Sequence, residues 1–188
     1  VMRTGSEVGI YHLCVRLSGY LAIPMRVAAT IAAAGCAEAY AQGRHEALRS
    51  SVRTAASLAL LIPLIPALLL ILAGPFVLNL FGADFVEGRH ALRLLAAGQV
   101  VYMLCGLNET VLTMTGHERL VRNIAVTAAI LNITLNAIMI PRWGMVGAAM
   151  ATAVCHGGWN LAGALLVRRI HGFWPGMIPV WRKVRTPS

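Results

Sequence analysis

Apolar runs of helical length, separated by short polar segments, follow one another along the whole chain. The longest lies between Arg53 and Asp84 and contains no charged residue. A membrane-spanning helix needs roughly 20 consecutive apolar residues, and several runs reach that length. The pattern predicts a single transmembrane bundle over residues 1–188 with about five helices. We expect them at approximately 8–34, 54–80, 94–115, 123–140 and 144–167.

Turn-forming and charged residues mark the connections between the predicted helices. The tightest connection is Pro141-Arg142-Trp143-Gly144. Proline lacks a backbone N–H and ends the fourth helix, while arginine and tryptophan suit the headgroup level of a bilayer. We expect Gly144 to reverse the chain, so that the fifth helix starts at once.

The composition supports a membrane protein. Hydrophobic residues make up 58% of the chain, charged residues 12%, and the mean hydropathy is +0.71. Soluble domains carry about 25% charged residues, and a soluble fold of this length could not bury so much apolar surface. The sequence therefore predicts an all-α integral membrane protein.

The basic residues predict an orientation, because they stay on the cytoplasmic side of short loops. Five helices place Arg3, Arg89, Arg93 and Arg142 on one side. They place Arg44, Arg49, Arg53, Arg119, Arg122, Arg168, Arg169, Arg182, Lys183 and Arg185 on the other. We expect a cytoplasmic C-terminus with a basic tail over 168–188. The net charge of +9 then reflects topology, and no nucleic-acid partner is expected.

Two arginines, Arg16 and Arg26, fall inside the first predicted helix, where a charge costs about 2.5–3.5 kcal/mol. Together with His12 they follow helical spacing and lie within a stripe about 80° wide. Such a face would line a water-filled, positively charged cavity that suits a phosphate or diphosphate. Alternatively, both arginines extend to opposite membrane interfaces.

Other polar residues lie in the third and fourth predicted helices. Glu109 is either an interfacial carboxylate paired with a loop arginine such as Arg119, or a counter-charge or coupling-ion site in a cavity. Asn132 and Asn136 are four residues apart and share a helix face. We expect them to form hydrogen bonds between helices.

The fifth predicted helix is rich in small residues. Gly144, Gly147 and Ala151 belong to this segment, in which small side chains let transmembrane backbones approach closely. We expect a packing seam there rather than chemistry.

Motifs that carry chemistry are missing from the sequence. It contains no CxxC, HExxH, nucleophile elbow or Gly-rich phosphate loop, and its four cysteines stand alone. We therefore expect no enzymatic activity, no cofactor and no metal.

Several landmarks occur in a specific order. They are Val8-Gly9-Ile10-Tyr11, Leu80-Phe81-Gly82, Thr115-Gly116, Asn132 with Asn136, and Ile140-Pro141-Arg142-Trp143-Gly144 leading into Gly147. Over about residues 6–170, the chain resembles the C-terminal half of the polysaccharide and O-antigen flippases. That family belongs to the multidrug/oligosaccharidyl-lipid/polysaccharide exporter superfamily.

The resemblance implies half of a two-bundle MATE-like transporter in the cytoplasmic (inner) membrane, working by alternating access. Its cargo would be a lipid-linked oligosaccharide of the polyprenyl diphosphate type, used for lipopolysaccharide and other surface polysaccharides. Arg16 and Arg26 would face the diphosphate, helped by His12, while the cargo's tail stays in membrane lipid. Because the chain starts at Val1 without a signal peptide, we expect a C-terminal part whose partner is a missing N-terminal bundle.

Two other functions stay open. A drug or metabolite antiporter of the same superfamily would need an acidic coupling residue, for which Glu109 is the available candidate. A membrane-embedded glycosyl- or acyltransferase subunit would need a histidine or carboxylate cluster at one interface. His117-Glu118 is the nearest match.

Overall fold

The computed structural model describes residues 5–176, and every regular element in that range is a helix. This confirms the all-α membrane fold class that the sequence predicts. The elements are α1 (Gly5–Tyr20), α2 (Ile23–Ala41), α3 (His45–Leu72), α4 (Gly74–Asn79), the 3₁₀ helix η1 (Ala83–Gly88), α5 (Arg89–Cys105), α6 (Asn108–Met114) and α7 (Glu118–His171).

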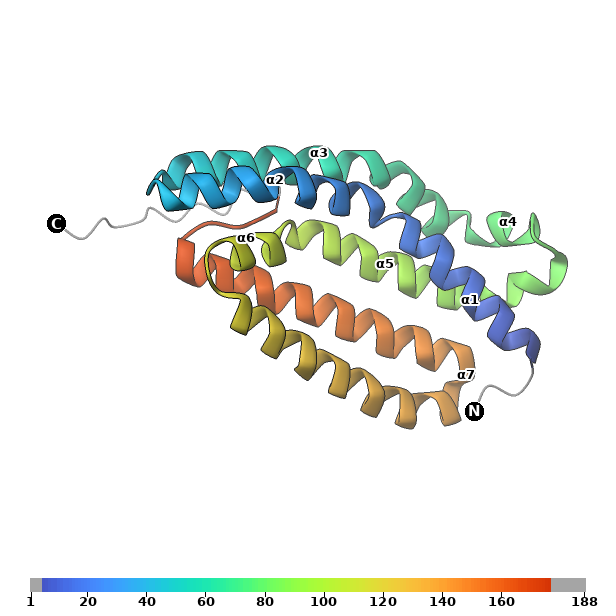
Figure 1. The fold of residues 1–188 in the computed structure, drawn as a ribbon. Helices are drawn as coiled ribbons and strands as arrows, with labels where there is room; N and C mark the ends of the chain where they lie inside the picture. Colours follow the sequence, from blue (N-terminus) through green and yellow to red (C-terminus); the bar gives the residue numbers. More distant parts are fainter. Residues whose placement is uncertain (1–4, 177–188) are drawn as a thin grey trace.

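The long helices lie roughly side by side in an elongated bundle (Figure 1). α2 runs beside α3, and α5 lies between these two helices and α7. One end of the bundle gathers the α2–α3 turn, the start of α7 and its end, while the other gathers α4, η1 and the start of α5. The first end carries most of the described basic residues, whereas Arg89, Arg93 and Arg142 lie at the second.

The first predicted helix, 8–34, is two helices in the structure. α1 and α2 meet at a 42° bend, where Leu21 and Ala22 donate backbone hydrogen bonds to Ser18 and Gly19, three residues back. Pro24 follows directly, and proline cannot donate the helical bond that would continue α1. A stripe that counts His12, Arg16 and Arg26 on one continuous helix is therefore wrong.

The third predicted helix, 94–115, is also divided. α5 ends at Cys105 and α6 begins at Asn108, with a bend of 42° and a positive φ of 68° at Gly106. The end of the described chain covers this break: Leu107 donates its N–H to the Pro175 carbonyl at 3.2 Å, and Trp174 Nε1 donates to the Leu104 carbonyl at 3.0 Å. Residues 173–176 thus pack back on the bundle, whereas the rest of the expected basic tail, 177–188, lies outside the described residues.

α7 is a hairpin rather than one continuous helix. Gly144 has φ 53° and ψ −132°. The chain folds back there into two antiparallel arms, a first arm over residues 118–143 and a second arm over residues 145–171 (Figure 1). A Cβ atom on Gly147 would overlap the Met139 carbonyl of the opposite arm. The turn predicted at Pro141–Gly144 is therefore where the chain reverses.

Length and hydropathy mark α3 and α7 as able to cross a membrane, or up to four segments if each bent pair counts as one span. α3 runs from His45 to Leu72, so it begins and ends earlier than the predicted 54–80. Residues 74–79 form the separate α4. The number of five crossings stays a prediction.

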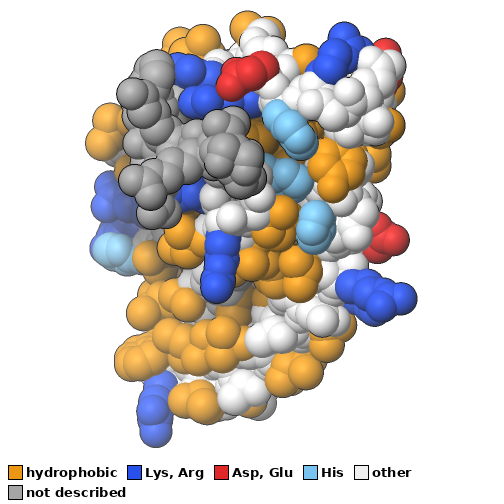
Figure 2. Space-filling view, turned by 90° about the vertical axis from the view of Figure 1, so that its left-hand side faces the viewer, with side chains coloured by type: hydrophobic (Ala, Val, Ile, Leu, Met, Phe, Trp, Pro, Cys, Tyr) orange, Lys and Arg blue, Asp and Glu red, His pale blue; other side chains and the backbone are white. Residues whose placement is uncertain are grey.

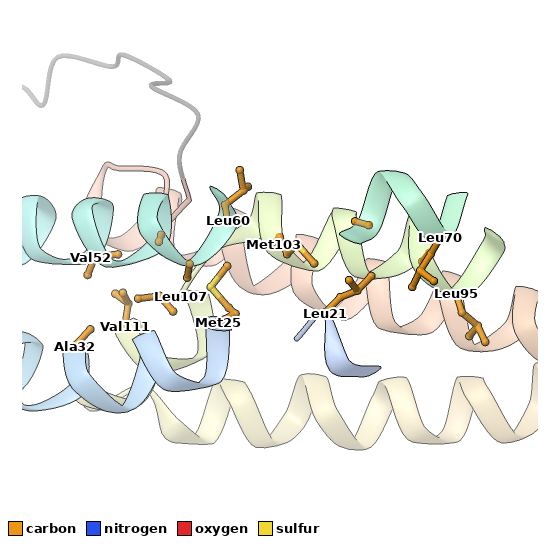
Figure 3. Close-up of a cluster of buried hydrophobic side chains, with 14 of the residues drawn as sticks. Leu21, Met25, Ala32, Val52, Leu60, Leu70, Leu95, Met103, Leu107 and Val111 are labelled. Atoms are coloured by element: carbon orange, nitrogen blue, oxygen red, sulfur yellow. The ribbon is translucent and has the colours of Figure 1, made fainter. Parts of the chain in front are cut away.

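A large part of the buried core lies between α2, α3, α5 and α6 (Figure 3), and residues of α1, α4 and α7 complete it. Met25, Val52, Met103 and Val111 each expose 1% or less of their surface. Large apolar side chains such as Ile65 are instead 77% exposed, as expected for a surface that faces lipid hydrocarbon. The core therefore fixes α2 against α6, which matters for the site described next.

Candidate functional site

A cavity of about 340 Å³, lined by both apolar and polar residues, lies between α2, the α5–α6 break and the second arm of α7. We call it the polar cavity because charged and amide side chains line part of it. Arg26 and Thr30 line it from α2, Glu109 from α6 and Asn160 from α7. The structure thereby brings together Arg26 and Glu109, two charges that the sequence places on different predicted helices. This cavity is the candidate functional site.

Two buried asparagines form the base of the cavity. Asn108 and Asn160 are each 2% exposed, and Asn108 Nδ2 donates to Asn160 Oδ1 at 3.2 Å. Asn160 Nδ2 donates in turn to the His156 carbonyl at 2.8 Å. These bonds tie the two amides to each other and to the backbone, so the base of the cavity consists of neutral dipoles that are fixed in place.

The two charged residues lie at the mouth. Arg26 and Glu109 are both exposed, and the charges of both act on the Tyr102 hydroxyl. Arg26 nevertheless forms no ion pair with any residue that the structure describes. The cavity therefore presents a guanidinium whose donors are available to a ligand.

Broken helices position these side chains. The break between α5 and α6 turns Asn108 and Glu109 toward α7 and α2, because Gly106 takes a positive φ of 68° that ends α5. Breaks within membrane helices often border ligand sites, since the freed backbone groups need polar neighbours. The Asn108 amide uses one such group by donating to the Gly106 carbonyl at 3.4 Å.

A second polar group extends from the cavity between α5 and α7. Tyr102 and His156 have ring centroids 5.2 Å apart, and the charge of Arg26 also acts on His156. Within the described residues, His156 Nε2 and Gln99 Oε1 are buried and have no hydrogen-bond partner. Among the described residues, His156 thus keeps a buried ring nitrogen open beside Tyr102, which lines the cavity.

The remaining predicted site residues lie elsewhere. His12 and Arg16 are exposed on α1 and do not line this cavity. Asn136 Nδ2 donates to Asn132 Oδ1 at 2.9 Å along the same arm of α7, so the bond joins the two within one helix. Their expected bonds between helices stay a prediction.

The small residues of the second arm of α7 do pack closely. Ala151 is fully buried, and a Cβ atom on Gly98 of α5 would lie 3.3 Å from Ala153. Gly144 makes the turn, and Gly147 allows the two arms to touch. Asn160 lies on this same arm and was not among the predicted site residues. Its amide side chain, within a segment of small apolar residues, was the feature that could have marked it.

Histidines and arginines gather at the end of the bundle that holds the α2–α3 turn (Figure 2). Thr115 is 4% exposed, and its hydroxyl oxygen lies 3.1 Å from both His117 Nδ1 and His171 Nε2. His171 follows the arginines that end the apolar part of α7. Burial lowers the pKa of His171, and the neighbouring His117 and His45 lower it further.

One family model, described as MatE, matches residues 2–138. The match runs from α1 through most of the first arm of α7 and includes Arg26 and Glu109, whereas Asn160 lies beyond it. No curated protein and no solved structure matches the chain.

Proposed function

Because this chain belongs to the MatE family of membrane transporters, we propose that it serves as a flippase component. Its cargo is a lipid-linked oligosaccharide diphosphate, carried across the cytoplasmic membrane for the synthesis of surface polysaccharides such as O-antigen. Arg26 in the polar cavity contacts the diphosphate. Arg16 and His12 on α1 are proposed as further contacts along the path.

The single observation that carries this proposal is Arg26 at the mouth of the cavity, with no ion pair to any described residue. An arginine among apolar helices is costly to hold unless an anion or water solvates it. Its planar guanidinium matches phosphate oxygens with two parallel hydrogen bonds. A diphosphate would complete the hydrogen bonding that residues 5–176 leave open at Arg26.

Transport of this kind needs movement rather than covalent chemistry. The break between α5 and α6 borders the cavity, and the bend between α1 and α2 lies about one helical turn before Arg26, so both give the bundle places to flex. The cavity would then open in turn to the two membrane surfaces. The basic end of the bundle faces the cytoplasm in this proposal, following the positive-inside rule.

Binding of a polyprenyl diphosphate to the purified chain tests the cargo assignment. Arg26→Ala should weaken binding about 10- to 100-fold, because a hydrogen bond to a charged group contributes about 1.5–3 kcal/mol. Arg26→Lys should retain part of the affinity, whereas Arg142→Ala, at the opposite end, should change nothing. Equal affinities for Arg26→Ala and the unchanged chain would refute the site.

A second candidate function, a drug or metabolite antiporter, is favoured by Glu109 in the same cavity. A carboxylate there could hold a cation or a coupling proton. Glu109→Gln distinguishes the two functions, because it should improve one activity and abolish the other. It should strengthen diphosphate binding severalfold, since it removes a negative charge, but it should abolish coupled uptake of a cationic substrate into proteoliposomes.

A further inference from the structure

An apolar groove of about 800 Å³ runs between α2 and α3. Its walls are exposed branched side chains: Ile31 is 74%, Leu58 60% and Ile62 67% exposed. Gly35 of α2 and Ala55 of α3 also line it from opposite sides, and a Cβ atom on Gly35 would meet no atom within 4 Å. The groove shares no lining residue with the polar cavity.

The groove is apolar at one end and polar at the other. Along α3 the lining changes from Ile62 and Leu58 to the hydroxyl residues Thr54, Ser51 and Ser50. A groove that binds only hydrocarbon chains, or one that packs against another protein helix, does not need this change from an apolar to a polar lining. An amphiphile with a head and a tail matches it.

Two opposite charges continue the groove beyond its polar end. Ile31, Gly35 and Glu38 are spaced three and four residues apart, so Glu38 extends the same face of α2 by one turn. On the α3 side, Arg44 lies one heptad before Ser51.

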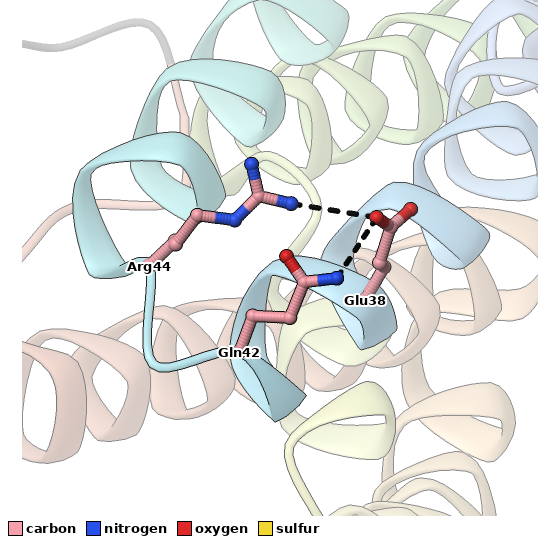
Figure 4. Close-up of polar contacts among 3 residues, drawn as sticks. All are labelled: Glu38, Gln42 and Arg44. Carbon is pink, nitrogen blue, oxygen red and sulfur yellow. Dashed lines mark hydrogen bonds and ion pairs between the residues drawn. The ribbon is translucent and has the colours of Figure 1, made fainter.

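These two charges already face each other. Arg44 and Glu38 are 3.4 Å apart, and Gln42 donates to the same Glu38 oxygen at 3.1 Å (Figure 4). Their side chains are 56% and 65% exposed, so the ion pair is weak and opens readily.

The length of the groove corresponds to one membrane leaflet. From Ser50 to Ile62 the lining follows α3 for about 18 Å at 1.5 Å per residue. Half the hydrocarbon thickness of a bilayer is about 15 Å. The polar end lies toward the end of the bundle that carries most of the described basic residues, where lipid headgroups of that leaflet would be.

We propose that this groove binds one phospholipid with a primary ammonium headgroup. An acyl chain lies along Leu58 and Ile62, the phosphate takes Arg44, and the ammonium takes Glu38. A zwitterionic head matches the paired charges, whereas an anionic head would bring a second negative charge against Glu38. This site is separate from the cargo cavity and does not depend on the function proposed above.

Native mass spectrometry of the purified chain tests this site with an equimolar mixture of dioleoyl phosphatidylethanolamine, phosphatidylcholine and phosphatidylglycerol. We expect one bound phosphatidylethanolamine per chain, at least fivefold more abundant than either competitor. Glu38→Gln should bring phosphatidylethanolamine down to the level of phosphatidylcholine, which has no N–H donor. Arg44→Gln should lower binding of all three lipids.

Filling the groove provides the matched control. Gly35→Leu and, from the opposite wall, Ala55→Phe should each reduce bound lipid at least fivefold. Gly158→Leu adds the same side chain at another helical glycine with open space around it and should change nothing. Circular dichroism shows whether each variant is folded.

Three results would overturn the lipid site: normal binding by both filled variants, preference for phosphatidylglycerol, or a chain dimer that Gly35→Leu dissolves. The last would show that a second copy of the chain occupies the groove. Because the measured ligand and variants differ from those of the diphosphate assay, failure here leaves the cargo assignment untouched.

Discussion

Gly163→Ala should destabilise the protein by disturbing the base of the cavity. A Cβ atom on Gly163 would overlap Asn108 Oδ1 and lie 2.9 Å from its Cγ. Asn108 is 2% exposed and holds Asn160 through a 3.2 Å hydrogen bond, so its amide cannot rotate away without breaking that bond. The methyl group of one alanine therefore acts on the polar pair directly.

The expected loss can be estimated from opposing effects. An unsatisfied buried amide costs about 1–3 kcal/mol and overpacking about 1–3 kcal/mol. Replacing a helical glycine by alanine returns about 1 kcal/mol. We expect a net loss of about 1–5 kcal/mol in the free energy of unfolding, measured by titration with sodium dodecyl sulfate and circular dichroism.

Gly158→Ala is the matched control, because it lies on the same arm of α7 with nothing within 4 Å of its Cβ position. It should be neutral or stabilise by about 0.5–1 kcal/mol. In an Asn108→Ala background, Gly163→Ala should lose most of its effect, since the clash is gone. If both glycine variants behave alike in the unchanged background, the steric reasoning is refuted.

Three further variants test the fold. Gly147→Ala should lower the free energy of unfolding by about 3 kcal/mol, because its methyl group meets the Met139 carbonyl, and unchanged stability would contradict the hairpin. Tyr11→Phe removes a 3.2 Å hydrogen bond to Thr152 and should lower the free energy of unfolding by about 0.6–1 kcal/mol in the same titration. Adding Thr152→Val should cause no further loss, because the hydrogen bond is already gone. The lowered pKa of His171 means that the unfolded chain binds more protons near and below about pH 6.5, so stability should be present above that pH and fall on acidification. His171→Gln should flatten the dependence of Tm on pH below about pH 6.5, and an equally steep slope would argue against His171 as its source.

Features set by local chemistry were predictable from the sequence. The reversal at Gly144 follows from a proline, two interfacial side chains and a glycine in a row, and the structure turns at that glycine. The all-α membrane fold follows from apolar runs of sufficient length. Both depend on neighbouring residues alone.

Helix breaks were harder to predict, because an apolar run does not reveal whether one helix or two fills it. Pro24 is a local cause of a kink, but the 42° bend before it also depends on how α1 packs against α5. The break at Gly106 depends on residues 173–176, which are distant in sequence and fill it. Neither the packing of α1 against α5 nor the contact of residues 173–176 with the Gly106 break can be read from a short stretch of sequence.

The candidate site was partly predictable for the same reason. The energetic cost of a charge in an apolar helix marked Arg26, and Glu109 was marked as a candidate cavity charge. That the two line one cavity depends on both breaks and on the packing of α2 against α6. Asn160 was missed because a single amide in a helix of small residues usually serves only to bond a neighbouring helix.

α2 separates the two proposed sites. Arg26, Thr30 and Ala33 face the polar cavity, whereas Ile31 and Gly35 face the apolar groove on the other side of the helix. Arg26 and Gly35 are nine residues apart, about 13 Å along the axis, and share no lining partner. Effects at such separations usually add. In the double variant with Arg26→Ala and Gly35→Leu, diphosphate binding should therefore fall as it does in Arg26→Ala alone, and phospholipid binding as it does in Gly35→Leu alone. Strong coupling between the two losses would mean that one lipid-linked ligand spans both sides of α2.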